Sequence, residues 1–365
     1  MKYKTLFAGA LTLLLGLASC GGNNTAKQES QMNVDESGQL LRGESTPALD
    51  AAFDQYLSAI QKDSMDIHSI MILQHGKVLK EKWMSEGAPE KAHILNSVSK
   101  TFTSTAVGFA ISEGLLKLDD KLIDVLSEYA PADPQENLKK VTVKDLLTMN
   151  CGQEIDPLYT LNRADTTVNW IQNFMVQPFL HEPGTWFAYN STGTYLLSAM
   201  VQKKAGMKVL DYLMPRLFEP LQITPDHWDE HDGINAGGWG LYLKTEDLAK
   251  MGQLLLQDGK WNGKQLLPEG WVKEASKKQV PSVPNMVRPD EMEKAGLTPE
   301  NSDWVQGYGY QMWRCRHNGF RADGANGQYI LVFPDLDAVI AVTANVQDMQ
   351  KELNEIYDTI LPSLK

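Results

Sequence analysis

The sequence lacks an excess of basic residues and lacks two common signature motifs. Asp and Glu outnumber Lys and Arg by 46 to 34, which gives a formal net charge of −12. Because a nucleic-acid partner needs a basic face, this balance argues against one, and it disfavours electrostatic docking on an anionic membrane. No G-x-S-x-G occurs, which removes the usual signature of an α/β-hydrolase. The segment Gly259–Lys264 lacks the spacing and the Ser or Thr of a P-loop, so a turn is predicted there.

A long hydrophobic run is also missing. The apolar stretch from Leu6 to Leu17 is too short to span a bilayer as a permanent helix. It ends in Leu17-Ala18-Ser19-Cys20, which resembles the lipobox of bacterial lipoproteins. That resemblance implies a signal peptide over residues 1–19, cleavage before Cys20 and a diacylglyceryl thioether on its sulfur. An ordinary signal peptide with a chance cysteine is the alternative.

The expected mature protein is therefore exported and anchored to a bacterial cell membrane through lipid alone, on the periplasmic or outer-membrane face. Cleavage would remove Lys2 and Lys4, so the formal charge of −12 would become −14. Only Cys151 and Cys315 would keep free thiols. A disulfide between them is compatible with export, but two unpaired buried thiols are favoured. The sequence does not indicate an oligomeric state.

The order of patterns along the chain predicts one domain. Residues 20–46 are polar and lack hydrophobic periodicity, which favours a disordered tether, and the domain is expected over residues 47–365. A helix is predicted from Pro47, and a β-hairpin over residues 67–83 turns at His75-Gly76. Residues 97–270 have mostly helical patterns, with Thr142 and Thr245 as predicted N-caps.

The last part of the chain returns to strands. A surface loop is predicted over residues 280–303, a second hairpin over residues 328–343, and a final helix after Met349. Strands near both ends with helices between them predict an α+β fold, an α/β class in the broad sense. One antiparallel sheet would be built from both chain ends and flanked by helices, with an inserted helical lobe. The cleft between the two lobes is the expected place for a site.

The segment Ser97-Val98-Ser99-Lys100 carries the strongest chemical signal. A serine hydroxyl is a poor nucleophile unless a nearby base takes its proton. In a helix, residues three apart share one face, so Lys100 would stand one turn above Ser97 and, if neutral, could act as that base. The first turn of a helix also offers free N–H groups to an oxyanion. The tetrapeptide alone is weak evidence, because chance supplies such matches.

Two later segments could complete the chemistry. Tyr189 precedes a predicted helix, and a tyrosine beside a lysine ammonium would have a lowered pKa and could relay a proton. Near the C-terminus, Ala322-Asp323-Gly324-Ala325 enters the second hairpin. Small residues there would let a strand edge approach the substrate, and the N–H of Ala325 could be a second oxyanion donor.

The chain resembles the serine β-lactamase and penicillin-binding-protein superfamily. It is most similar to the class C β-lactamase-related group, which includes esterases, D-amino-acid peptidases and 6-aminohexanoate-dimer hydrolases. The resemblance covers roughly residues 49–365. Its motifs occur in order at Asn96–Phe102, Glu113-Gly114, Val141–Met149, Pro183–Thr185, Gly237–Leu241, Gly259–Lys264 and the hairpin from Gly327.

The resemblance implies a β-lactamase/transpeptidase-like fold and a set of site residues. Ser97 would be the acylated nucleophile, Lys100 its proton acceptor and Tyr189 the second acid/base, with the N–H groups of Ser97 and Ala325 as the oxyanion hole. The family's Tyr-x-Asn is here Tyr189-Asn190-Ser191, so a hydroxyl replaces the amide that contacts the lysine and the substrate. Ser191 can still contact the lysine, and Asn190 could supply an amide if the loop turned differently.

The third motif departs further. Where much of the superfamily has Lys-Thr-Gly or His-Thr-Gly, this chain has Ala322-Asp323-Gly324. Asp323 and Gly324 are thus candidate substrate-binding residues that lack the usual cation. An aspartate there disfavours an anionic substrate, although Arg314, Arg316 and Arg321 are near in sequence and could compensate.

These observations predict an exported, lipid-anchored serine hydrolase that cleaves a small-molecule ester or amide through an acyl-enzyme intermediate, without a cofactor. The alternatives are a catalytically inactive ligand-binding member of the fold and a D,D-peptidase acting on peptidoglycan. No metal site is expected, because His227 and His231 lie in a predicted loop without a third ligand. The aromatic residues between Trp304 and Trp313 are expected to form core and cleft wall.

Overall fold

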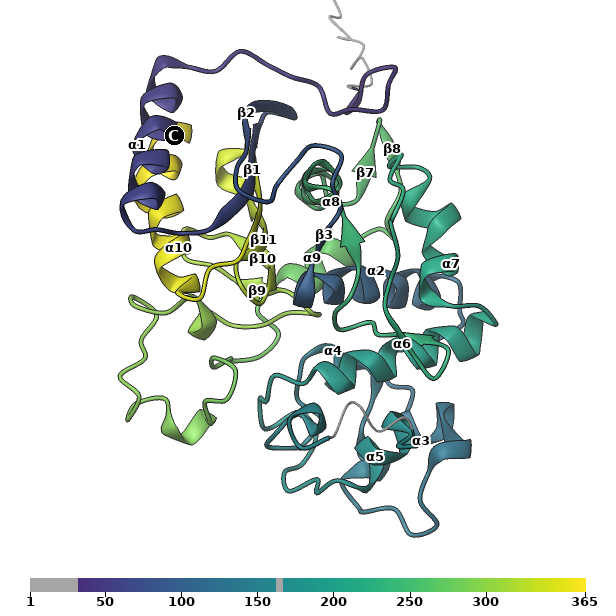
Figure 1. Ribbon diagram of the computed structural model, residues 1–365. Helices are drawn as coiled ribbons and strands as arrows, with labels where there is room; N and C mark the ends of the chain where they lie inside the picture. Colours follow the sequence, from purple (N-terminus) through teal and green to yellow (C-terminus); the bar gives the residue numbers. More distant parts are fainter. Residues whose placement is uncertain (1–31, 162–166) are drawn as a thin grey trace, which may run out of the picture. The chain divides into compact units, whose positions relative to one another are not determined.

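A six-stranded antiparallel sheet forms the centre of the computed structural model, which describes residues 32–161 and 167–365 (Figure 1). The strand order is β2-β1-β12-β11-β10-β9. The strands come from both ends of the described chain: β1 Ile67–Gln74, β2 Lys77–Trp83, β9 Trp313–Arg314, β10 Phe320–Gly324, β11 Gln328–Phe333 and β12 Ala338–Ala344. Because β12 pairs with β1, strands from both ends of the described chain join in one sheet, as predicted.

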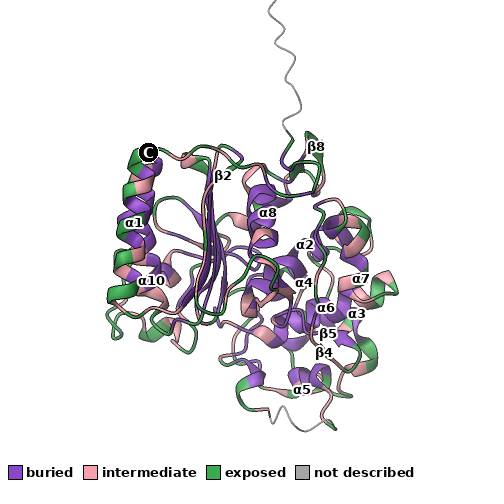
Figure 2. Cartoon of the chain, turned by 45° about the horizontal axis from the view of Figure 1, so that its top comes forward, coloured by how far each residue is buried: buried purple, intermediate pink, exposed green. Residues whose placement is uncertain are grey.

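Helices cover both faces of this sheet. Side chains alternate along a strand, so Ile70 and Ile72 of β1 pack on one face with α1 (Pro47–Lys62) and α10 (Met349–Glu355). Met71 and Leu73 point to the other face, toward α8 (Thr245–Leu256). Figure 2 shows the inner strands buried, the edge strand β2 partly exposed and the outer side of α1 exposed. Each buried aliphatic side chain contributes about 1.5–3 kcal/mol, so these two layers hold the sheet in place.

The segment between β2 and β9 supplies the predicted helical lobe and three short strand pairs. Its helices are α2 Ser99–Ser112, α3 Leu122–Val125, α4 Val143–Leu147, α5 Trp170–Val176, α6 Ser191–Ala205, α7 Val209–Leu213 and α9 Trp271–Ser276, besides α8. The strand pairs are β3 His93–Ile94 with β6 Tyr242–Leu243, β4 Glu230–His231 with β5 Ile234–Asn235, and β7 Lys260–Trp261 with β8 Lys264–Gln265.

One of the two predicted helix caps is confirmed. The Thr142 side chain accepts from the N–H of Asp145, whose carboxylate accepts from the N–H of Thr142, so a capping box starts α4. Thr245 is instead the first residue of α8, and Lys244 is its N-cap. The Thr245 hydroxyl lies 2.6 Å from the Ser69 hydroxyl of β1, a tertiary partner that local sequence does not reveal.

The predicted tether is wrong for residues 32–46, because this segment packs on the domain. Val34 and Leu40 are buried, and Asn33 and Asn262 exchange two hydrogen bonds of 2.8 and 2.9 Å. Arg42 forms an ion pair of 2.9 Å with Glu246 of α8. The apolar residues are too few and too far apart to produce a periodic pattern. The partners of Asn33 and Arg42 lie about two hundred residues away, so local sequence does not reveal them.

The predicted signal peptide and the lipidated Cys20 lie outside the described residues. In residues 32–161 and 167–365, no helix is both long enough and apolar enough to cross a membrane.

Candidate active site

Ser97 lies where the sheet meets the helical lobe. It occupies a 3-10 turn, Asn96–Val98, that leads directly into α2. The end of β10 passes close to this turn, since a Cβ atom on Gly324 would come within 2.3 Å of the Leu95 carbonyl oxygen. A glycine at this position therefore lets the strand approach the nucleophile, although Gly324 itself does not line the cavity.

The structure brings Lys100 to Ser97. The side chain of Lys100 is buried, and its Nζ lies 2.9 Å from Ser97 Oγ, 3.0 Å from Ser191 Oγ and 2.7 Å from the carbonyl oxygen of Gly238. A neutral amine has two N–H groups and one lone pair. It can donate to Gly238 and Ser191 and accept the hydroxyl proton of Ser97, which uses all three contacts.

The surroundings of Lys100 favour this neutral amine. Burial lowers the pKa of Lys100 to about 7, and the negative charges of Asp156 and Asp323 only partly oppose the shift. A base with a pKa near the working pH is well suited to take a proton and return it. Lys100 thus has the geometry and the basicity that activation of Ser97 requires.

Tyr189 lies beside Ser97 and Lys100. Its pKa is raised, so the lowering of this pKa that the sequence predicted is wrong. Lys100 Nζ lies 4.9 Å from the centre of the Tyr189 ring, so the amine faces the ring. The ring stacks on Trp313 at 5.5 Å. Burial raises the pKa of Tyr189 well above its usual range, and a hydrogen bond with Ser97 offsets this only in part. Tyr189 therefore stays a phenol, which can donate a proton.

Ser191 and Asn190 take different positions at the start of α6. Ser191 lines the cavity and contacts Lys100. Asn190 is buried and caps the helix, because its Oδ1 accepts from the N–H of Gly193 at 2.8 Å and its Nδ2 donates to Gln153 at 2.9 Å. The amide of Asn190 is thus used for structure and does not reach the cavity.

Asp156 is a site residue that sequence reasoning missed. Its buried carboxylate accepts from the N–H of Ser191 at 2.6 Å and from the hydroxyl of Thr192 at 2.5 Å. It holds the first turn of α6 and places a negative charge near Lys100. Asp156 belongs to a segment without hydrophobic periodicity. The only sequence feature that marks it is its place directly before Pro157, because Asp-Pro is a common helix start.

The turn after β10 is tied to the nucleophile turn. The carbonyl oxygen of Ala325 accepts from Asn96 Nδ2 at 2.8 Å and from Gln328 Nε2 at 3.2 Å. Both Ser97 and Ala325 line the cavity. The bond from Asn96 ties the Ala325 backbone to the turn that carries Ser97, and a two-donor oxyanion hole needs these two backbones close together.

Asp323 lines the cavity, but the three arginines near it in sequence do not. Arg321 is fully buried and its Nε donates to Asp323 Oδ2 at 2.8 Å. Arg314 bonds to the Ser276 carbonyl, and Arg316 pairs with Asp303. The cation missing from the third motif is therefore not replaced in the cavity lining.

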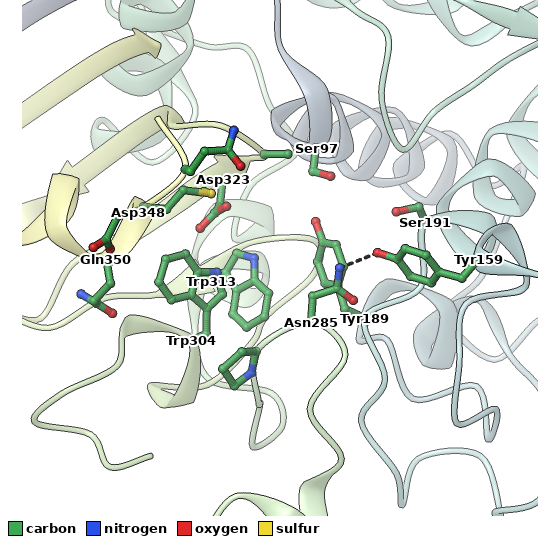
Figure 3. A pocket seen from close by; sticks show the side chains of 14 residues that line it. Ser97, Tyr159, Tyr189, Ser191, Asn285, Trp304, Trp313, Asp323, Asp348 and Gln350 are labelled. Carbon is green, nitrogen blue, oxygen red and sulfur yellow. Dashed lines mark hydrogen bonds between the residues drawn. The ribbon is translucent and has the colours of Figure 1, made fainter. Parts of the chain in front are cut away.

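The cavity at Ser97 has a volume of about 470 Å³, enough for a small molecule (Figure 3). Asn285 Nδ2 donates to Tyr159 Oη across one end at 2.5 Å. Trp304 and Trp313 form part of its wall. The lining residues are Ser97, Tyr159, Tyr189, Ser191, Pro284, Asn285, Trp304, Trp313, Asp323, Ala325, Gln347, Asp348, Met349 and Gln350.

The two cysteines of the described chain are both buried and unpaired, as predicted. Burial raises the pKa of each thiol. Neither one lines the cavity, so neither thiol is a candidate nucleophile of this site.

Known proteins share this fold and most of its length. A sequence profile of the family described as Beta-lactamase matches residues 53–362. The 6-aminohexanoate-dimer hydrolase of Paenarthrobacter ureafaciens is 25% identical over 300 residues, which cover 77% of this chain and 73% of that protein.

Two solved structures are similar in fold. A penicillin-binding protein homologue from Caulobacter crescentus has a TM-score of 0.63 at 16% identity, over 84% of this chain and 93% of its own. EstCE1, a hydrolase with promiscuous acyltransferase activity, has a TM-score of 0.69 at 16% identity, over 86% of this chain and all of its own (100%).

Proposed function

The chain belongs to the beta-lactamase family, and on that basis we propose that it is a serine hydrolase which cleaves an ester or a linear amide through an acyl-enzyme. One observation carries the proposal. Lys100 Nζ lies 2.9 Å from Ser97 Oγ in surroundings that lower the pKa of the amine to about 7. A buried lysine with no catalytic task would be a costly feature, because burial of an ammonium is unfavourable.

The site residues account for acylation. Ser97 Oγ forms a bond to the substrate carbonyl carbon as its proton passes to Lys100 Nζ. The carbonyl oxygen becomes an oxyanion, which the N–H groups of Ser97 and Ala325 stabilise. The bond to the leaving group then breaks. Tyr189 gives its proton to the leaving alcohol or amine and regains one from the Lys100 ammonium.

Deacylation reverses these roles. A water molecule attacks the acyl carbon and its proton passes to Lys100, while the same N–H groups hold the second oxyanion. The bond to Ser97 Oγ then breaks, and the proton returns to that oxygen. The products are a carboxylic acid and the regenerated site, so atoms and charges balance without a cofactor.

Two considerations favour simple esters and linear amides as substrates. A relative at 25% identity is named for hydrolysis of a 6-aminohexanoate dimer, which is a linear amide. β-Lactams and D-Ala peptides carry a carboxylate on the carbon bonded to the reacting amide nitrogen, next to Ser97, whereas the carboxylate of a 6-aminohexanoate dimer lies five methylenes away. No Lys or Arg is among the described residues lining the cavity, so a carboxylate held close to Ser97 is disfavoured. β-Lactam hydrolysis and D,D-peptidase activity therefore rank second.

An activity screen tests the proposed function. The purified protein and Ser97→Ala are assayed on p-nitrophenyl esters, linear amides, D-amino-acid amides and nitrocefin. Ser97-dependent turnover of an ester or a linear amide supports the proposal. Ligand-induced thermal stabilisation without turnover would instead support the inactive binding protein, and release of terminal D-Ala from muropeptides would support the peptidase.

We also propose that the protein is exported and lipid-anchored at Cys20, on the basis of the N-terminal sequence. Metabolic labelling with a fatty acid in bacterial cells tests this. We expect label in the membrane fraction for the native chain and none for Cys20→Ala. Equal labelling of both would contradict the anchor.

A further inference from the structure

The cavity at Ser97 has two unlike ends (Figure 3). One end has no charged side chain in its described lining and contains Asn285 and Tyr159, which are hydrogen-bonded to each other. The other end, here called the acidic end, consists of the indole rings of Trp304 and Trp313 and the carboxylates of Asp323 and Asp348. Ser97 lies between the two ends, so a substrate bound for attack can reach the acidic end.

Positive charge is absent from the lining of the described cavity. It contains two aspartates and neither Lys nor Arg. Lys100 is buried beside Ser97 and does not line the cavity, and its pKa of about 7 leaves the amine about half neutral at pH 7. Arg321 is fully buried. Its guanidinium carbon, Cζ, lies 5.0 Å from the centre of the Trp304 ring and 5.7 Å from the centre of the Trp313 ring. Its charge is balanced by Asp323 at 2.8 Å.

The carboxylates of the acidic end keep acceptor capacity. Asp323 uses Oδ2 for Arg321, and within the described residues no bond occupies its Oδ1. Asp348 is exposed at the N-terminus of α10, where its Oδ1 accepts from the N–H of Lys351 at 3.0 Å. A carboxylate also has a second oxygen that can face the cavity.

We propose that the natural substrate carries an ammonium group, which binds at the acidic end. Among the described residues, no ion pair compensates the carboxylate of Asp348, so it attracts an ammonium. The face of the Trp304 indole attracts it as well, whereas the Trp313 ring already stacks on Tyr189. Asp323, whose charge Arg321 balances, adds its unoccupied Oδ1 as an acceptor. A substrate carboxylate would find no counter-ion there. The formal net charge of −12 further favours the approach of cationic molecules. This inference rests on the proposed function, because it names the substrate class of the same site.

Matched ester pairs test the charge alone. In the first pair, p-nitrophenyl esters have acyl chains that end in trimethylammonium or in the isosteric, neutral tert-butyl group. In the second pair, the leaving alcohol is choline or its tert-butyl analogue, with acetate as the acyl group. We expect the ammonium member of at least one pair to have a kcat/KM about tenfold higher. A p-nitrophenyl ester whose acyl chain ends in carboxylate should be the poorest substrate.

Asp348→Asn is the decisive variant, because asparagine is also a good N-cap and should preserve α10. Asp348→Asn should lower, by about threefold, the ratio of kcat/KM for the ammonium ester to kcat/KM for its neutral partner. Asp54→Asn removes one charge from the exposed side of α1, outside the cavity, and should leave the ratio unchanged. Thermal melting confirms that both variants are folded.

Three results separate the claims. If Ser97-dependent turnover occurs and neither pair favours the ammonium, the inference is overturned and the proposed function stands. An unchanged ratio in Asp348→Asn, or a preference for the carboxylate ester, also overturns the inference. If the native protein hydrolyses neither these esters nor the linear amides of the activity screen, the proposed function fails, and this inference fails with it.

Discussion

The Nζ atom of Lys100 donates to the carbonyl oxygen of Gly238 at 2.7 Å, on a segment 138 residues away. Gly238 is close-packed there, since a Cβ atom on it would lie 2.9 Å from the Ser191 carbonyl oxygen and 3.4 Å from Lys100 Nζ. The bond fixes the amine so that its lone pair can face Ser97. The position of the Lys100 amine therefore depends on the segment around Gly238 as well as on α2.

Replacing Lys100 by Arg tests whether the amine is a base. A guanidinium keeps its proton at any working pH, so Lys100→Arg can donate but cannot accept. We expect kcat/KM on an uncharged p-nitrophenyl ester to fall by about 10²–10⁴. Lys204→Arg, on the exposed side of α6, is the matched control and should keep native activity. Near-native turnover by Lys100→Arg would argue against proton transfer to this residue.

The pH dependence of the reaction follows from the lowered pKa of Lys100. Below about pH 7 the amine is protonated and cannot take the Ser97 proton, and above it the amine is free. We expect kcat/KM for an uncharged ester to rise with pH through an apparent pKa near 7. A rate that stays flat from pH 5 to pH 9 would contradict this assignment; that range brackets the pKa by about two units.

Asp156→Asn should shift this profile in a defined direction. The negative charge of Asp156 raises the pKa of Lys100, so its removal should lower that pKa further. The rising limb of the profile should therefore move to lower pH. Some stability should also be lost, because the carboxylate accepts from Ser191 and Thr192. A shift toward higher pH would contradict the electrostatic role.

Tyr189→Phe removes the phenol and keeps the ring that stacks on Trp313. We expect kcat/KM to fall by about 10²-fold, since one proton-transfer group is lost. The apparent pKa near 7 should remain, because it belongs to Lys100. Steady-state rates across pH check both points. Loss of that pKa together with the phenol would assign it to Tyr189 instead.

The packed segment 32–46 should contribute to stability. Leu40 is fully buried, so Leu40→Ala should cost about 2–5 kcal/mol in the free energy of unfolding. A chain that begins at residue 47 should melt at a lower temperature than one that begins at residue 32. Thermal and denaturant unfolding of the two chains measure this. Equal melting temperatures would mean that the segment acts only as a tether.

Sequence patterns predicted the sheet and the contact between Ser97 and Lys100 because local patterns encode both. Short, mostly apolar runs next to turn residues indicate β1 and β12, whose two faces are both buried, and a spacing of three places Lys100 over Ser97. Other features depend on distant contacts. Asp156, the Gly238 carbonyl and the buried Leu40 gain their roles from partners elsewhere in the chain. The raised pKa of Tyr189 likewise follows from its packing, which no motif specifies.

The central claim is that Ser97 becomes acylated, and mass spectrometry tests it most directly. The protein is incubated with a fluorophosphonate, whose phosphorus forms a bond to the nucleophile as fluoride leaves. We predict one adduct, mapped to the peptide that contains Ser97, with no adduct on Ser97→Ala and strongly reduced labelling of Lys100→Arg. An adduct at another residue, or ester turnover that persists in Ser97→Ala, would contradict the account.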